Sequence, residues 1–220
     1  SIKILRELVN EGYHYKPFDK DKSVANWSVQ DGTLVGGLTA IKGVGAKLAE
    51  TILRKRTEGK PFTERERKLL NEGTTPWDKV FEASERWGHI IRNPEKFNIL
   101  TPLTLLKDIT QHSDGTFVFI AKLTEKNLRD HNELQNLVKR GGKRMEGQSL
   151  FLNMTLEDDT DSMMASVNRF DYLKWGVPLI ESGKIGDWYI WKGVNHSGFR
   201  KIRISRWRKL TGNEEFTRKD

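Results

Sequence analysis

The chain has 220 residues, of which 36% are hydrophobic and 31% charged, and its formal net charge is +8. This length allows one large domain or two small ones. The absence of cysteine excludes disulfides and zinc sites with thiolate ligands, and the five histidines are too scattered to suggest a metal cluster. No run nears the roughly 20 apolar residues that span a bilayer, and no secretory signal is visible. We therefore expect a cytoplasmic protein without cofactor, metal or membrane contact, and the charge favours nucleic acid as partner, although a basic surface also serves solubility alone.

The first half of the chain is predicted to be mostly helical. Residues 1–11 carry apolar side chains at helical spacing. Two short strands, around 24–29 and 33–35, flank Asp31-Gly32, a pair suited to a tight hairpin turn.

Two further helices should begin at capping boxes in this half. Thr63 is followed three residues later by Glu66, and Thr75 by Asp78. The second of these helices should stop before Asn93-Pro94, because the residue preceding a proline is disfavoured in helical geometry.

The second half of the chain alternates apolar and polar residues at period two, which is typical of strands. Its order of three strands, a helical connection and two strands is that of a five-stranded OB-type barrel. The predicted elements are strands at 116–123, 150–156, 162–167, 188–194 and 200–207, with the helical connection at 170–180. The fold class is therefore α+β: a helical domain at 1–98, a barrel at 99–210 and a flexible tail at 211–220.

The strongest motif is a glycine turn between two helical segments, Leu38 to Ile52, within a hairpin at about 38–57. Its sequence LTAIKGVGAKLAETI matches the helix-hairpin-helix consensus, in which glycines allow a tight turn and close approach of a phosphate. The second helix begins there with unpaired amides and a partial positive charge, which favours anions. The candidate DNA-binding residues of this hairpin are Lys42, Gly43, Val44, Gly45, Ala46 and Lys47.

Val44 is expected to act from inside the hairpin, locking its two helices together rather than touching the ligand. The alternative for the whole motif is an ordinary packing corner in which glycine only caps a helix. Such a hairpin contacts phosphate and sugar, so the binding should be independent of base sequence and sensitive to salt.

A second basic surface is predicted on the barrel. Alternation along 200–209 places Ile202 and Ile204 on one side and Lys201, Arg203 and Trp207 on the other, a combination of charge and aromatic ring that suits single-stranded nucleic acid. Tyr189 and Trp191 are candidates to extend this surface, unless their rings pack in the barrel core.

Two loops complete the candidate sites. The long loop between the first two strands carries Lys139, Arg140, Lys143 and Arg144, at a position where OB folds often bind nucleic acid, or it is simply solvated. The acidic turn at Asp158, Asp159 and Asp161 is expected to be a hairpin turn rather than a cation site.

The segment Gly32–Gly45 (GTLVGGLTAIKGVG) and the later Gly59–Phe62 (GKPF) resemble the C-terminal part of the alpha subunit of bacterial DNA polymerase III, a family C polymerase. The order of parts agrees over about residues 13–210. In that family the hairpin holds duplex DNA behind the active site, and a following OB domain lies near the single-stranded template. The resemblance does not extend to the family's palm carboxylates, which would not fit before this hairpin, so we expect no polymerase activity.

These features predict a non-catalytic module of replication or repair that holds duplex or primer-template DNA by the hairpin and single-stranded DNA by the barrel. It would be a fragment, a split subunit or a stand-alone relative of phage type, in the nucleoid or in a phage-infected cell. Replisome proteins or a separate polymerase subunit are possible partners. The alternatives are a structure-specific nuclease or other DNA-processing subunit, and an adapter that binds replisome proteins.

Overall fold

The computed structural model describes residues 2–110, 112–133, 147–212 and 214. The chain divides into two compact units, one ending at Phe81 and the other beginning at Glu82, and each is described by itself. The sequence placed the limit between domains at 98–99 instead. The difference arises because helix α4 (Glu82–Arg92) packs on the outside of the barrel and so belongs to the second unit. No helix within the described parts of the chain has the length and apolarity needed to cross a membrane.

The first unit opens with helix α1 (Ile2–Asn10) and a small sheet of three strands in the order β1-β3-β2. β2 (Ser28–Gln30) and β3 (Thr33–Val35) form the predicted antiparallel hairpin. Asp31 and Gly32 both adopt positive φ, 51° and 75°, which is the backbone of a type I′ turn. Strand β1 (His14–Lys16), which the sequence did not indicate, pairs in parallel with β3.

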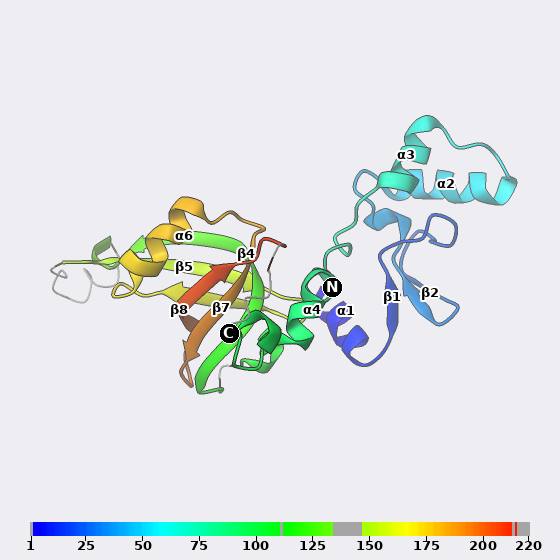
Figure 1. The fold of residues 1–220 in the computed structure, drawn as a ribbon. Coiled ribbons are helices and arrows are strands. Elements are labelled where there is room, and N and C mark those ends of the chain that lie inside the picture. The colour runs from blue at the N-terminus through cyan, green and yellow to red at the C-terminus, as the bar shows by residue number, and fades with distance from the viewer. Residues whose placement is uncertain (1, 111, 134–146, 213, 215–220) are drawn as a thin grey trace. The chain divides into compact units, whose positions relative to one another are not determined.

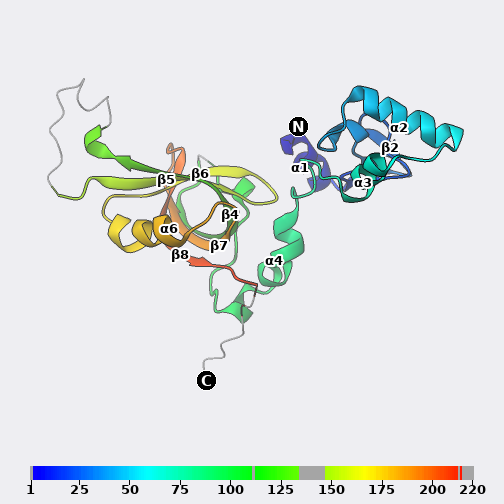
Figure 2. The same cartoon turned by 90° about the horizontal axis from the view of Figure 1, so that it is seen from above.

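Two helices, α2 (Ala46–Glu58) and α3 (Glu64–Glu72), lie side by side in Figures 1 and 2. They share a core that excludes water from both, built from Leu38, Ile41, Val44, Ala49, Ile52 and Leu70. The predicted capping box at Thr63 is confirmed, since its hydroxyl accepts from the amide of Glu66 and its own amide donates to the Glu66 carboxylate. That carboxylate also receives Lys55 Nζ at 2.7 Å, so one side chain caps α3 and ties it to α2.

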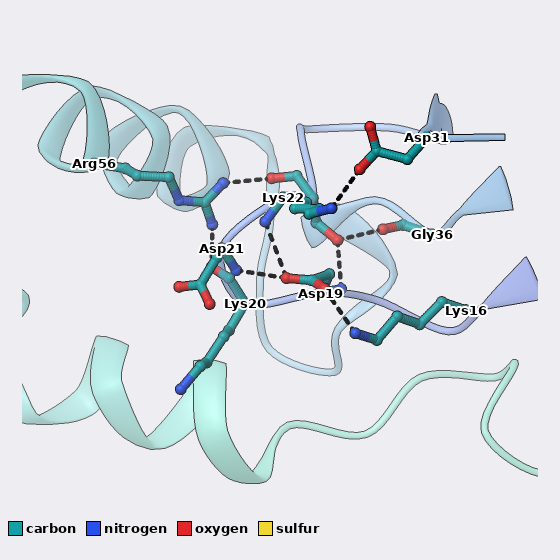
Figure 3. Close-up of polar contacts among 9 residues, drawn as sticks. Lys16, Asp19, Lys20, Asp21, Lys22, Asp31, Gly36 and Arg56 are labelled. Carbon is teal, nitrogen blue, oxygen red and sulfur yellow. Dashed lines mark hydrogen bonds and ion pairs between the residues drawn. The ribbon is translucent and has the colours of Figure 1, made fainter. Parts of the chain in front are cut away.

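A loop between β1 and β2 is organised around Asp19 (Figure 3). The Asp19 carboxylate accepts from the amides of Asp21 and Lys22, at 2.9 and 3.1 Å, and from Lys16 Nζ at 2.7 Å. The Lys16 hydrogen bond, followed by that of the Asp21 amide, lowers the pKa of Asp19 to about 2. Arg56 of α2 donates to the carbonyls of Lys20 and Ser23 in the same loop, which holds the loop to α2.

Asp19→Asn should lower the free energy of unfolding by about 1 kcal/mol at pH 6, because a charged hydrogen-bond acceptor is lost. The folded-state pKa of Asp19 is depressed, so its contribution is present above pH 3.8 and is lost as the pH falls through about 2. Urea titrations of both proteins at a series of pH values between 6 and 2 measure this. A difference between them that stays constant down to pH 2 would contradict the assignment.

The second unit is a closed five-stranded barrel with the strand order β4-β5-β6-β8-β7, visible as a ring in Figure 2. All neighbouring pairs are antiparallel except β6 with β8, which are parallel. This is the order expected of an OB-type barrel, and it confirms the predicted α+β fold class. The strands are β4 (Gly115–Asp130), β5 (Leu150–Glu157), β6 (Ser162–Val167), β7 (Trp188–Asn195) and β8 (Lys201–Lys209).

Alternate residues of every strand point into the barrel, as the period of two predicts. The predicted helical connection between β6 and β7 consists of a π-helical turn, Tyr172–Gly176, and helix α6 (Val177–Ser182). Lys126 Nζ donates to the carbonyls of Leu179, Ile180 and Gly183 at 2.6 to 3.2 Å, so an ammonium group on β4 caps the end of α6.

Helix α4 starts later than the sequence indicated. Thr75 and Asp78 do form the expected local hydrogen bonds, but they close a turn rather than open a helix. The helix begins at Glu82 because Asp159, in the turn between β5 and β6, accepts from the amides of Ala83 and Ser84 at 2.7 and 2.5 Å. The predicted end before Asn93-Pro94 is confirmed.

Asp159→Ala should lower the free energy of unfolding of the second unit by about 1 to 2 kcal/mol, the usual cost of removing a helix N-cap. The loss should be concentrated in α4, so amide hydrogen exchange of residues 83–90 should accelerate. Asp161→Ala is the matched control, because within the described residues the Asp161 side chain accepts a hydrogen bond only from the neighbouring Ser162 amide. Equal exchange rates in the two variants would show that Asp159 does not anchor α4.

Candidate nucleic-acid interface

The glycine turn of the first unit is held from behind by buried apolar side chains. A short 3₁₀ turn at Leu38–Ala40 leads into it, and Val44 is only 4% exposed among the core residues of α2 and α3. The amide of Val44 donates to Ile41 O at 2.9 Å, and that of Lys42 donates to Thr74 O at 2.9 Å. The predicted role of Val44 as an internal lock is confirmed, and the amide of Lys42 is already used within the fold.

The other amides of the turn lie at the surface. Gly43, Gly45, Ala46 and Lys47 are exposed, and their amides have no hydrogen-bond partner within the described residues. Gly45 is the N-cap of α2 and brings no side-chain cap. The N-terminus of a 13-residue helix therefore presents unpaired donors and a partial positive charge to solvent, with the Lys42 and Lys47 side chains exposed beside it.

The two glycines of this turn serve different purposes. Gly43 has φ +92°, a conformation that a residue with a β-carbon rarely adopts. Gly45 has an ordinary φ of −85°, and a β-carbon added there would meet nothing within 4 Å. Gly43 is therefore required by the backbone, whereas the space at Gly45 is open to an approaching ligand.

The exposed face of the barrel runs across four strands. Asn127, Asn153, Ser166 and Arg203 are paired in register from β4 through β5 and β6 to β8, and form one continuous row. In the row on one side of it, Lys201 donates to Asn153 Oδ1 at 3.1 Å. In the row on the opposite side, the rings of Phe151 and His131 pack together with their centroids 4.5 Å apart. The structure thus places Lys201 and Arg203 on one polar, cationic face, to which Asn153 and Phe151 add groups that the sequence reasoning missed.

Two predicted members of this face are not on it. Tyr189 and Trp191 are both 0% exposed and lie in the barrel core. Trp191 donates to Ala121 O at 3.0 Å, and burial is the main cause that raises the pKa of Tyr189 to about 12. The prediction that their rings extend an exposed surface is wrong, because their positions on β7 point inward where the barrel needs large side chains.

Trp207 also departs from the predicted alternation. The pairing of β7 with β8 shifts register between Lys192 and Gly193, opposite Ser205, so the inward and outward positions of β8 exchange after the shift. Trp207 consequently packs against the barrel core, and its ring nitrogen donates to Trp175 O at 2.9 Å. Arg206 and Arg208 take the outward positions instead.

The remaining predicted residues fall elsewhere. Lys139, Arg140, Lys143 and Arg144 lie outside the described residues. The acidic turn is a hairpin turn, as expected, in which Asp158 accepts from the amides of Thr160 and Asp161. Within the described residues no group of three or more histidine and acidic side chains is arranged to hold a metal ion.

Comparison with known proteins bears on the unit that contains the hairpin turn. Residues 12–71 match the model of the helix-hairpin-helix motif. A stretch of 96 residues, 43% of this chain, is 30% identical to DNA polymerase III PolC-type of Staphylococcus saprophyticus. The first unit is a helix-hairpin-helix region related to that of DNA polymerase III. The matched stretch covers 6% of that polymerase.

The match to the helix-hairpin-helix model includes more than the turn. It runs from before β1 through α2 and ends within α3, so it covers the small sheet as well as both helices. The helix-hairpin-helix region therefore has its exposed amides at one corner of a larger packed unit. The exposed cationic side chains of this region include Arg65, Arg67 and Lys68 on α3, where the sequence shows no binding motif.

Proposed function

We propose that the chain is a non-catalytic DNA-binding module of replication that grips the sugar-phosphate backbone without regard to base sequence. The observation that carries this proposal is that the amides of Gly43, Gly45 and Ala46 lie exposed beside two lysines and have no hydrogen-bond partner in the part of the chain that the structure describes. Phosphate oxygens accept hydrogen bonds from such amides and are attracted by the helix N-terminus. The relation to DNA polymerase III supports replication as the setting.

In this proposal each of the two units binds a different type of DNA. The hairpin offers hydrogen-bond donors and positive charge but no side chain placed to contact base edges in a groove. Such a surface suits the backbone of duplex or primer-template DNA. The barrel face offers Arg203 and Lys201 for phosphates, amides of Asn127 and Asn153 for base edges, and the Phe151 ring for stacking, which suits a single strand. Binding by both should weaken steeply with salt, because phosphate contacts release counterions.

Lys42→Glu with Lys47→Glu should weaken duplex binding at least tenfold at moderate salt and reduce the slope of log K against log salt by about 1.8, or 0.9 per phosphate contact. Fluorescence anisotropy over a salt series measures both quantities. The matched control is Arg54→Glu with Lys60→Glu, which makes the same charge change away from the turn: Arg54 lies roughly 12 Å along α2 from Ala46 at 1.5 Å per residue, and Lys60 follows the far end of the helix. An equal loss in the control would mean that only net charge matters.

Gly45→Ala tests the contribution of the backbone amides to DNA binding independently of the two lysines. The added methyl group has open space in the fold, so stability should change by less than about 1 kcal/mol. The methyl group would nevertheless stand at the corner that a phosphate must approach, and duplex affinity should fall while net charge is unchanged. Unaltered affinity would remove the hairpin amides from the proposal.

Lys201→Glu with Arg203→Glu should weaken binding of a single-stranded oligonucleotide about tenfold or more and leave duplex binding within about twofold. Lys192→Glu with Arg206→Glu is the control, because these two residues are paired across β7 and β8 away from the Asn153 row. Anisotropy with single-stranded and duplex probes measures this. If both variants lose single-strand affinity equally, the barrel binds through diffuse charge rather than through this face.

The absence of catalysis is likewise a proposal, and a direct assay tests it. Labelled forked, duplex and single-stranded DNA, incubated with the purified chain and Mg²⁺ or Mn²⁺, should remain intact. Metal-dependent cleavage would favour the alternative of a DNA-processing enzyme subunit.

A further inference from the structure

A hollow lies beside the hairpin turn, between that turn and the helix α3. Its volume is about 260 Å³, and Lys42 stands at the side of the turn. From α3 come Arg65 and Lys68, and Leu69 lines the same hollow with its Cδ2 3.7 Å from where a β-carbon at Gly43 would stand. Positions 65, 68, 69 and 72 recur at helical spacing, so one face of α3 forms the wall of this hollow.

The hollow has an excess of positive charge. Lys42, Arg65 and Lys68 are exposed, and none of them takes part in an ion pair within the described residues. Among the described residues that line the same hollow, Glu72 is the one carboxylate. Three unpaired cations against one acid leave a local charge that a phosphodiester would neutralise, whereas a cationic or neutral ligand would not.

The wall and the turn are held together as one piece of structure. The Lys42 amide donates to Thr74 O, directly after α3. A β-carbon at Gly73 would lie 2.5 Å from Ile41 Cγ2 and 2.2 Å from Leu69 O, so the backbone at the end of α3 packs tightly against the residue that precedes the turn. The backbone of α3 that carries Arg65 and Lys68 is therefore packed directly against the turn that presents the amides of Gly43 and Gly45.

We propose that this hollow is a second backbone-binding site, in which Arg65 and Lys68 take a phosphate adjacent to the one held at the α2 N-terminus, with Lys42 between the two. The inference rests on the proposed function and extends the footprint of the hairpin from one helix end to two neighbouring phosphates. Arg65 can form two parallel hydrogen bonds to a phosphate, whereas Lys68 supplies a point charge. Glu72 opposes binding by repelling the same phosphate.

The experiment uses the full chain and a duplex probe in a salt series read by fluorescence anisotropy. Arg65→Gln with Lys68→Gln should reduce the slope of log K against log salt by about 0.9, as expected when the one phosphate in the hollow is no longer neutralised. Arg67→Gln is the control on the same helix, because Arg67 is exposed but does not line the hollow, and its slope should be close to that of the unmodified chain. Glu72→Gln should strengthen binding about threefold or more, a gain that cannot come from unfolding.

The outcomes separate this inference from the proposed function. If Lys42→Glu with Lys47→Glu weakens binding but Arg65→Gln with Lys68→Gln behaves like Arg67→Gln, the hairpin binds DNA and the second site does not exist. If Glu72→Gln leaves affinity unchanged or lowers it, the hollow does not receive a phosphate. If the unmodified chain fails to bind the probe with a salt-dependent affinity, the proposed function itself is wrong.

Discussion

Burial of Val44 is the constraint on which the hairpin depends. With Val44 packed among Ile41, Ala49 and Ile52, the chain has to turn sharply at Gly43 and direct the following amides away from the core. A polar or smaller residue at position 44 would remove apolar area from this core. The packing that holds the turn with its amides pointing to solvent would then be weakened. The anion-binding geometry is thus a consequence of hydrophobic packing on the opposite side of the same backbone.

In the barrel, one irregularity in strand pairing decides which side chains face solvent. The register shift opposite Ser205 leaves Lys201 and Arg203 outward, brings Trp207 inward and turns Arg206 and Arg208 out. The aromatic side chains of β7 and β8 consequently pack in the barrel interior, where the ring of Tyr189 contacts those of Trp191 and Trp207. The exposed face carries Lys201 and Arg203 among mostly polar side chains, with Glu125 and Met164 in the row of Lys201 and the ring pair of His131 and Phe151 at its border.

Each unit also relies on polar side chains that join elements far apart in the sequence. Glu66 caps its own helix and pairs with Lys55 on the neighbouring helix. Lys126 caps α6 from β4, and Asp159 caps α4 from the turn between β5 and β6. In every case a charged group satisfies backbone groups at a helix end, where the helix has no partner of its own. Such contacts set where helices begin and end, and they explain why α4 belongs with the barrel.

The sequence by itself determined the features that depend on local chemistry: the type I′ turn at Asp31-Gly32, the capping box at Thr63, the inward Val44, and the order of strands read from their alternation. These depend on backbone preference and on periodicity, which neighbouring residues specify. Only the tertiary structure decided the start of α4, the inward rings of Tyr189 and Trp191, the shifted phase of Trp207, and the placement of Arg65 and Lys68 beside Lys42. Each of these results from contacts between segments distant in the chain, and alternation along one strand carries no information about which face its neighbours cover or where a bulge interrupts the pairing.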